Sequence, residues 1–290
     1  MPLIINADDL AIHPRISEGI FKAYADGVLT SASMLVTTPF FSETVGQLAS
    51  TDLPVGLHLS LTLGKAISPA SRLPELTDGD GHFSHDAMHF LFPGSGATRS
   101  FYDQITDELD AQIRLALDHG VRPTHLDSHQ HVHMNPRIFE IVETLAMKYA
   151  IGRMRIVRER IHGFAAWLGL GTNIYRKNPV KVVLLRGLER RIRPRLATND
   201  LFFGLMYSGN MSSDVLLRLA GRIRPDSVLE LCAHPGYCAP EAGLYPQEKD
   251  NSFIRHPARE RELAMLLDPA VKDRLRRRDI KLISFRGIPI

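Results

Sequence analysis

Short apolar runs alternate with segments of helical periodicity along this 290-residue chain, and that alternation limits the folds it can adopt. The predicted strands are 3–5, 29–36, 55–61, 124–133, 153–157, 228–234 and 280–285. The predicted helices are 14–26, 39–49, 100–119, 136–149 and 257–276. Strands and helices that alternate about seven times predict a parallel β/α arrangement, either closed into a barrel or wound as an open sheet.

Polar side chains at the carboxyl ends of the predicted strands favour the barrel. Asp8 and Asp9 follow the first strand. His58 lies on the face of its strand that carries small and polar residues, opposite the apolar face. His129 and His234 lie at or near the ends of two later strands. In a β/α barrel the chemistry is built at that rim, so we expect these five side chains to gather there.

A stripe of ionisable side chains occupies every second position of the segment 124–133. Its members are His125, Asp127, His129, His131 and His133. If the whole segment is extended, all five side chains point to one face. Such groups cannot pack in an apolar core without partners, so the face is expected to line a polar cavity or to hold a metal. The alternative is a solvent-facing edge strand.

Size and composition set the class of protein. The chain is 44% hydrophobic, which suffices for a substantial core, and we predict a single domain over residues 1–290. The formal net charge of +3 does not indicate a nucleic-acid partner. Two cysteines are too few for a disulfide framework, and we read Cys232 as a buried thiol. We identify neither a signal peptide nor an apolar run of membrane-spanning length, which predicts a cytoplasmic location.

The interval 151–195 is strongly basic, with twelve Arg or Lys residues against two Glu, a difference of +10. Apolar residues recur at helical spacing between the charges from Val180 to Ile192. We therefore expect a basic, helical insert around 160–200. One interpretation is peripheral contact with the inner face of a membrane or with an acidic ligand, and the other is a solvated surface helix.

A hydrolytic metal site needs two or three protein ligands, an open position for water and a base that takes the proton from that water. Histidines of the stripe, together with His58, are candidate ligands, and Asp8 and Asp9 offer a further ligand and a base. Two adjacent aspartates also occur simply in loops or at helix starts. His234 suits a general acid that protonates a leaving amine, although a structural, hydrogen-bonded histidine is the alternative.

These motifs together resemble the YdjC-like (ChbG/HpnK) carbohydrate deacetylases. The matching stretches are Asn6 to Asp9, Gly56 to His58, His125 to His133 and His234 to Gly236. The resemblance implies a distorted (β/α) barrel related to the polysaccharide deacetylase and glycoside hydrolase/deacetylase superfamily. It also implies one divalent metal, Mg²⁺ or Zn²⁺, and hydrolysis of the N-acetyl group of an amino sugar, an amide bond that is not a peptide bond.

Carried over residue by residue, the resemblance implies Asp9, His58 and His129 as metal ligands. It implies Asp8 as the general base and His234 as the general acid. Arg259 and Glu262 match a recurring pair on the last helix, and their role is left open between structural and substrate-orienting. Leu10-Ala11 replaces the usual Phe-Gly, and Gln130 replaces a usual histidine or lysine, so the pocket is expected to differ in detail.

Three functions remain open from the sequence. The first is a metal-dependent deacetylase acting on a chitooligosaccharide or on a hopanoid-type glycolipid head group. The second is a metal-dependent phosphoesterase with two metals about 3.5–4 Å apart on a similar barrel. The third is a non-catalytic protein that binds lipid at a membrane surface through 151–195. The native metal and a homodimer are also left open.

Overall fold

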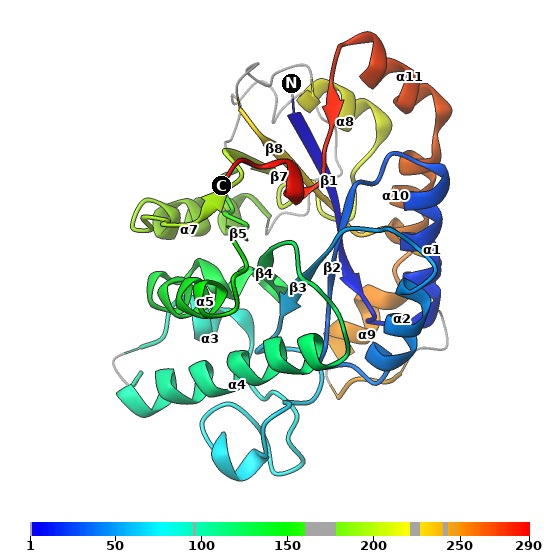
Figure 1. The fold of residues 1–290 in the computed structure, drawn as a ribbon. Helices are drawn as coiled ribbons and strands as arrows, with labels where there is room; N and C mark the ends of the chain where they lie inside the picture. The colour runs from blue at the N-terminus through cyan, green and yellow to red at the C-terminus, as the bar shows by residue number, and fades with distance from the viewer. Residues whose placement is uncertain (1, 95–96, 160–177, 221–226, 240–242, 247) are drawn as a thin grey trace.

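The computed structural model describes the chain except for residues 1, 95–96, 160–177, 221–226, 240–242 and 247 (Figure 1). Its centre is a parallel sheet with the strand order β6-β5-β4-β3-β2-β1-β8-β7, and β9 pairs with β1 beside this path. The strands are β1 (Pro2–Leu10), β2 (Ser31–Met34), β3 (Val55–Leu59), β4 (Leu126–Ser128), β5 (Arg153–Met154), β6 (Ala197–Thr198), β7 (Leu201–Phe203), β8 (Leu229–Ala233) and β9 (Lys281–Leu282).

One short segment joins the two ends of this sheet. The strand β6 pairs with β5, and β7 pairs with β8, yet only two residues separate β6 from β7. One of them, Asn199, exchanges hydrogen bonds with the backbone of Ile156 just after β5, at 2.8 and 2.9 Å. The sheet therefore curls until the segment 197–203 touches both of its ends, and the predicted barrel-like class is confirmed.

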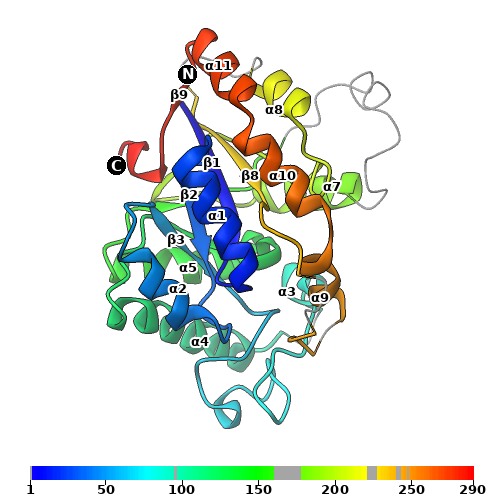
Figure 2. The ribbon, with the colours of Figure 1, turned by 90° about the vertical axis from the view of Figure 1, so that its right-hand side faces the viewer.

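Helices lie around the outside of the curled sheet (Figures 1 and 2). They are α1 (Pro14–Asp26), α2 (Phe41–Leu48), α3 (Ala87–Leu91), α4 (Arg99–Asp118), α5 (Pro136–Lys148), α7 (Asn178–Glu189), α8 (Ser213–Ala220), α9 (Glu248–Arg255), α10 (Ala258–Leu267) and α11 (Pro269–Arg277). Several starts follow from local sequence. Asn135 caps α5 by accepting hydrogen bonds from two backbone N–H groups, and Pro136 occupies the first turn, where it needs no partner.

The helix predicted over 257–276 is wrong, because two helices cover this stretch. Pro269 cannot continue α10, and it disfavours helical geometry at the preceding residue, Asp268. Asp268 is extended and its side chain caps α11 by accepting a hydrogen bond from Ala270. No helix among the described residues is long and apolar enough to cross a membrane.

The predicted ten-residue histidine strand is also wrong beyond Ser128. The strand β4 holds only Leu126–Ser128, and a short 3₁₀ segment (His129–Met134) follows. Gln130 and His131 adopt left-handed backbone angles, with φ of 54° and 61°, which turns the chain sharply away from the strand direction. The side chains after this turn therefore do not continue the alternation of the strand.

Candidate metal and catalytic site

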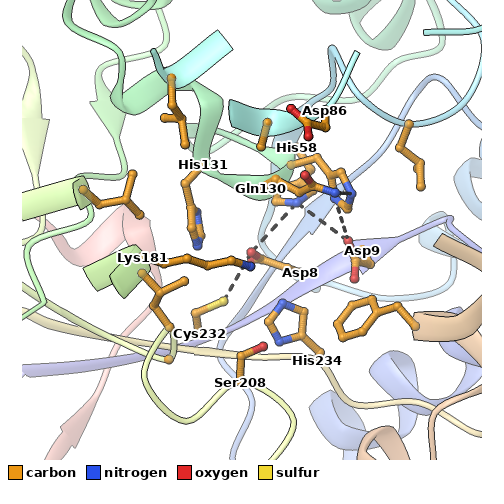
Figure 3. A pocket seen from close by; sticks show the side chains of 18 of the residues that line it. Asp8, Asp9, His58, Asp86, Gln130, His131, Lys181, Ser208, Cys232 and His234 are labelled. Carbon is orange, nitrogen blue, oxygen red and sulfur yellow. Dashed lines mark hydrogen bonds and ion pairs between the residues drawn. The ribbon is translucent and has the colours of Figure 1, made fainter. Parts of the chain in front are cut away.

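Four strands carry the predicted site residues to one rim of the barrel. Asp8 and Asp9 lie at the end of β1, which runs through the middle of the sheet and is buried from Leu3 to Leu10. His58 lies in β3, His129 directly follows β4, and His234 directly follows β8. Figure 3 shows Asp8, Asp9, His58 and His234 pointing toward one another from these separate strands.

Asp9, His58 and His129 form a compact, buried group. Asp9 Oδ1 lies 3.3 Å from His129 Nδ1 and 3.7 Å from His58 Nε2, and the centres of the two imidazole rings are 5.5 Å apart. One ligand atom from each residue lies within 4.8 Å of the others. Ligand atoms around a tetrahedral zinc are about 3.4 Å apart when each bond is about 2.1 Å. The spacing and the donor types both fit a divalent cation.

The two aspartates point in different directions because the backbone between them is irregular. Asp9 has a φ of 69°, and the pairing of β1 with β2 shifts register between Ala7 and Leu10. Asp9 Oδ2 accepts a hydrogen bond of 2.7 Å from Arg259. Burial opposes ionisation of Asp9, but the contacts with His129 and Arg259 outweigh it and hold the pKa of Asp9 well below its usual value.

Asp8 is held by a buried arginine that the sequence analysis counted only as part of the basic segment. The guanidinium of Arg155 donates to both oxygens of Asp8, at 2.7 and 2.8 Å, and also contacts Asp127 and Glu230. Arg155 is fully buried, so it is no surface charge. The sequence feature that could have indicated its burial is its position in the predicted strand 153–157, between the apolar residues Met154 and Ile156.

The charges around His58 set its protonation. Asp127 Oδ1 lies 2.8 Å from His58 Nδ1, which leaves the Nε2 atom of His58 facing Asp8 and Asp9. Burial by itself lowers the pKa of His58, but Asp127, Asp8 and Asp9 raise it to about 9. For Asp8, burial is outweighed by Arg155 and His58, which hold its pKa well below the usual value. Asp8 is therefore a carboxylate at neutral pH.

The members of the histidine stripe divide into separate environments, so the single common face is not observed. His125 and Asp127 both contact Ser33 Oγ, at 3.1 and 2.7 Å. The His125 ring stacks on Phe285 with 3.5 Å between centres, deep in the barrel. Beyond the left-handed turn, His133 is held between Ser128 and the carbonyl of Arg155. His125 and His133 are structural, since protein groups occupy both of their ring nitrogens.

A cavity of about 470 Å³ opens at this site. Asp8, Asp9, His58, His129 and His234 all line it. Its other lining residues, many of them apolar, are Ile12, Leu63, Asp86, Ala87, Met88, Leu91, Gln130, His131, Lys181, Leu184, Leu185, Gly204, Leu205, Ser208, Cys232, Ser252, Phe253 and His256. Within the described chain, His234 Nδ1 is buried and has no hydrogen-bond partner. Because His234 lines the cavity, its imidazole can contact a molecule bound there.

Comparison with known proteins agrees with this geometry. A model of the family described as YdjC-like protein matches residues 2–277, nearly the whole chain. This chain belongs to the YdjC-like family. A Geobacillus stearothermophilus relative named carbohydrate deacetylase is 30% identical, and the match covers 98% of this chain and 96% of the relative. A Yersinia pestis relative named chitooligosaccharide deacetylase is 28% identical over 98% of this chain and 97% of its own length.

A solved structure has the same fold as this YdjC-like chain. It is an Enterococcus faecalis V583 protein described as a candidate cellobiose-phosphate cleavage protein. The match has a TM-score of 0.72 and 26% identity, and it covers 99% of this chain and 98% of that one. The fold assignment therefore has independent support over the full length.

The raised pKa of His58 predicts how the metal-free YdjC-like protein responds to pH. His58 has a folded-state pKa of about 9 against an ordinary value of 6.5, so its stabilising contribution is complete below pH 6.5 and is lost as the pH rises through 9. We expect the free energy of unfolding to fall by about 2 kcal/mol between pH 7.5 and 9.5 on this account. Urea unfolding in EDTA between pH 7.5 and 9.5 measures this fall in unfolding free energy. The window starts above the pKa of about 7 that burial gives Glu230, so the titration of Glu230 contributes little to the change.

The control for this pH effect is His58→Gln, which removes the imidazole and should leave only the smaller fall that comes from the Cys232 thiol, whose pKa burial raises. A wild-type protein whose unfolding free energy stays constant from pH 7.5 to 9.5 in EDTA would contradict the assignment of a charged His58.

Proposed function

We propose that this protein is a metal-dependent deacetylase that hydrolyses the N-acetyl group of an amino sugar. The observation that carries the proposal is the convergence of Asp9, His58 and His129 on one side of a cavity that also contains Asp8 and His234. The names of the relatives, carbohydrate deacetylase and chitooligosaccharide deacetylase, support the same reaction and the same class of substrate.

One divalent cation, Mg²⁺ or Zn²⁺, is proposed to be held by Asp9, His58 and His129. Bound there, the cation would polarise the acetyl carbonyl and make a neighbouring water more acidic. The His58 ligand is oriented before a cation binds, because the 2.8 Å contact between its Nδ1 and Asp127 fixes the ring with Nε2 toward the cavity. Imidazole nitrogens and a carboxylate suit Zn²⁺ better than Mg²⁺, which prefers oxygen ligands.

Asp8 and His234 are proposed to move the protons. Asp8 is ionised and faces the same space as His58 Nε2, at 3.9 Å, so it can accept the proton of the attacking water. Arg155 holds the Asp8 carboxylate in one orientation through two hydrogen bonds. His234 lies on the same cavity wall and can donate a proton to the departing amine.

The apolar walls of the cavity favour a substrate in which the amino sugar is attached to a lipid, over a short chitooligosaccharide. Met88 and Leu91 of α3, with Leu184 and Leu185 of α7, supply much of this apolar lining. Outside the cavity, Val180 and Val183 of α7 are 59% and 58% exposed among basic residues. We propose that α7 touches the cytoplasmic face of a membrane peripherally.

We propose that the chain forms one catalytic domain over 1–290 with a basic insert around 160–200. Within this insert the predicted helix is observed as α7 (Asn178–Glu189). The part over 160–177 lies outside the described residues. The homodimer left open by the sequence is settled by measuring molecular mass in solution.

The two-metal phosphoesterase is the less favoured alternative. A second group of candidate ligands, Asp8, Cys232 and His234, lies beside the first and shares its cavity. Both oxygens of Asp8 are engaged by Arg155, and a positive guanidinium beside that group disfavours a second cation. We expect one bound metal per chain by elemental analysis, and two would favour the phosphoesterase.

Acetate release tests the proposed function. We expect the full-length protein to release acetate from either short N-acetylglucosamine oligomers or an N-acetylglucosaminyl lipid in detergent micelles. Activity should disappear after chelation and return when Zn²⁺ or Mg²⁺ is added back. If neither substrate yields acetate with either metal, while anionic vesicles still bind the chelated protein, the non-catalytic lipid-binding alternative is favoured instead.

A further inference from the structure

The helix α10 carries two buried charges whose role the sequence left open. Arg259 and Glu262 are three residues apart, so both side chains lie on one face of the helix, and they are only 1% and 2% exposed. Figure 2 shows α10 beside α1, which directly follows the strand that carries Asp8 and Asp9. Burying two charges is costly unless each meets a specific partner, so their partners indicate what they do.

Arg259 is held in place at several points and contacts Asp9. Its Nε donates to the carbonyl of Phe253 at 3.2 Å, and its guanidinium lies 4.2 Å above the centre of the Phe253 ring. Its Nη2 donates to Asp9 Oδ2 at 2.7 Å. This contact occupies one oxygen of Asp9 and leaves the other, Oδ1, directed at His129 and His58. Arg259 therefore selects the oxygen that faces the candidate cation site.

Glu262 joins two segments that line the cavity. Its Oε2 accepts a hydrogen bond of 2.6 Å from the backbone N–H of His234, just after β8. Its Oε1 accepts one of 3.1 Å from the N–H of Gly209, in the loop that follows β7. His234 and Ser208, the neighbour of Gly209, both line the cavity. A single carboxylate thus sets the spacing between the candidate general acid and a polar group on another loop.

We propose that Arg259 and Glu262 are positioning residues with separate tasks. Arg259 acts through Asp9 on cation binding, and Glu262 acts through His234 and the Ser208 loop on the catalytic step. The effect of Glu262 on the catalytic step rests on the proposed function. The effect of Arg259 on cation binding, and that of Glu262 on the backbone at Gly209 and His234, can be measured without any substrate. Groups that orient a metal ligand typically change metal affinity or activity by about 10–100-fold when they are replaced.

The Arg259 half is tested by titrating Zn²⁺ into the metal-free, full-length protein by calorimetry. We expect Arg259→Gln to weaken Zn²⁺ binding by about tenfold or more, because the Asp9 carboxylate is free to rotate. Arg259→Lys keeps the positive charge and should recover part of the affinity. The matched control is Arg276→Gln, which removes an exposed arginine paired with Asp273 on α11 and should bind Zn²⁺ as the wild type does.

Two results would overturn the Arg259 half. Unchanged Zn²⁺ affinity in both variants would mean that Arg259 does not orient Asp9. Tighter binding in Arg259→Gln would mean that Arg259 acts only by repelling the cation. If Arg259→Gln does not fold, Arg259→Lys alone carries the test, since it keeps the buried charge next to Asp9.

The Glu262 half is tested with Glu262→Gln. Its amide has one oxygen for two N–H donors, so we expect faster hydrogen–deuterium exchange in the peptides that contain Gly209 and His234. We also expect kcat for acetate release to fall by about 10–100-fold while Zn²⁺ affinity stays within twofold of the wild type. The matched control is Glu260→Gln on the same helix, which should leave kcat unchanged; the exposed Glu260 carboxylate accepts a hydrogen bond from the N–H of Cys238 in the loop after β8.

These readouts separate this inference from the proposed function. If no sugar releases acetate in the wild type, the proposed function fails, yet Zn²⁺ affinity and hydrogen exchange still decide the roles of the two residues. Equal losses of Zn²⁺ affinity and activity in both variants, accompanied by lower melting temperatures, would mean that α10 is only structural. Unchanged exchange at Gly209 and His234 in Glu262→Gln would also overturn the proposal.

Discussion

Replacing Asp8 by asparagine is expected to lower kcat for acetate release by about 10²–10⁴-fold, the usual contribution of a general base. The amide cannot accept the proton of the attacking water, although it has nearly the same shape as the carboxylate. Arg155 keeps its contacts with Asp127 and Glu230, so its buried charge remains compensated. Because Asp8 is not among the three proposed ligands, we expect Zn²⁺ binding to persist.

Kinetics and Zn²⁺ titration on the same Asp8→Asn preparation measure this separation. The matched control is Asp110→Asn, since Asp110 bonds Lys148 and Tyr149 on the outer helices and does not line the cavity. Its kcat should stay within about twofold of the wild type, as expected for a surface substitution remote from the site. Wild-type turnover in Asp8→Asn would remove Asp8 from the mechanism and leave the base unidentified.

Replacing His129 by alanine is expected to abolish both cation binding and acetate release. His129 supplies one of three proposed ligands, and its Nδ1 lies 3.3 Å from Asp9. A group that only orients a ligand costs about 10–100-fold in affinity, so losing a ligand should cost more than about 100-fold. Calorimetry with Zn²⁺ and acetate release at saturating Zn²⁺ measure the two effects.

The control for the loss of His129 is His119→Ala, which removes an exposed histidine at the end of α4. It should retain both Zn²⁺ affinity and turnover. Acetate release at the wild-type rate by His129→Ala, or undiminished Zn²⁺ affinity, would contradict the ligand set of Asp9, His58 and His129. Together with Asp8→Asn, this variant separates loss of the base from loss of the cation.

The sequence predicted the barrel-like class because its evidence is local. Parallel strands require crossover helices, and the two periodicities alternate visibly along the chain. The same logic located Asp8, Asp9, His58 and His234 at strand ends, and all of these side chains line one cavity. Parallel strands in one sheet run the same way, so residues at their carboxyl ends meet even when far apart in sequence.

The segment that joins the ends of the sheet was missed for the opposite reason. The strands β6 and β7 hold two and three residues, too few to show any alternation. Their pairing partners, β5 and β8, determine their conformation. The turn at Gln130 and His131 was missed in the same way, because a left-handed backbone at two non-glycine residues is unfavourable locally and must be stabilised by the surrounding structure.

The sequence by itself determined the class of fold, the rim at which the candidate site lies and most of the residues that line its cavity, because strand and helix periods are properties of neighbouring residues. Only the tertiary structure decided which charges meet. Arg155 neutralises Asp8 across 147 positions, and Arg259 reaches Asp9 across 250. Coulombic and hydrogen-bonded partners are chosen by distance in space, and no local pattern encodes that distance.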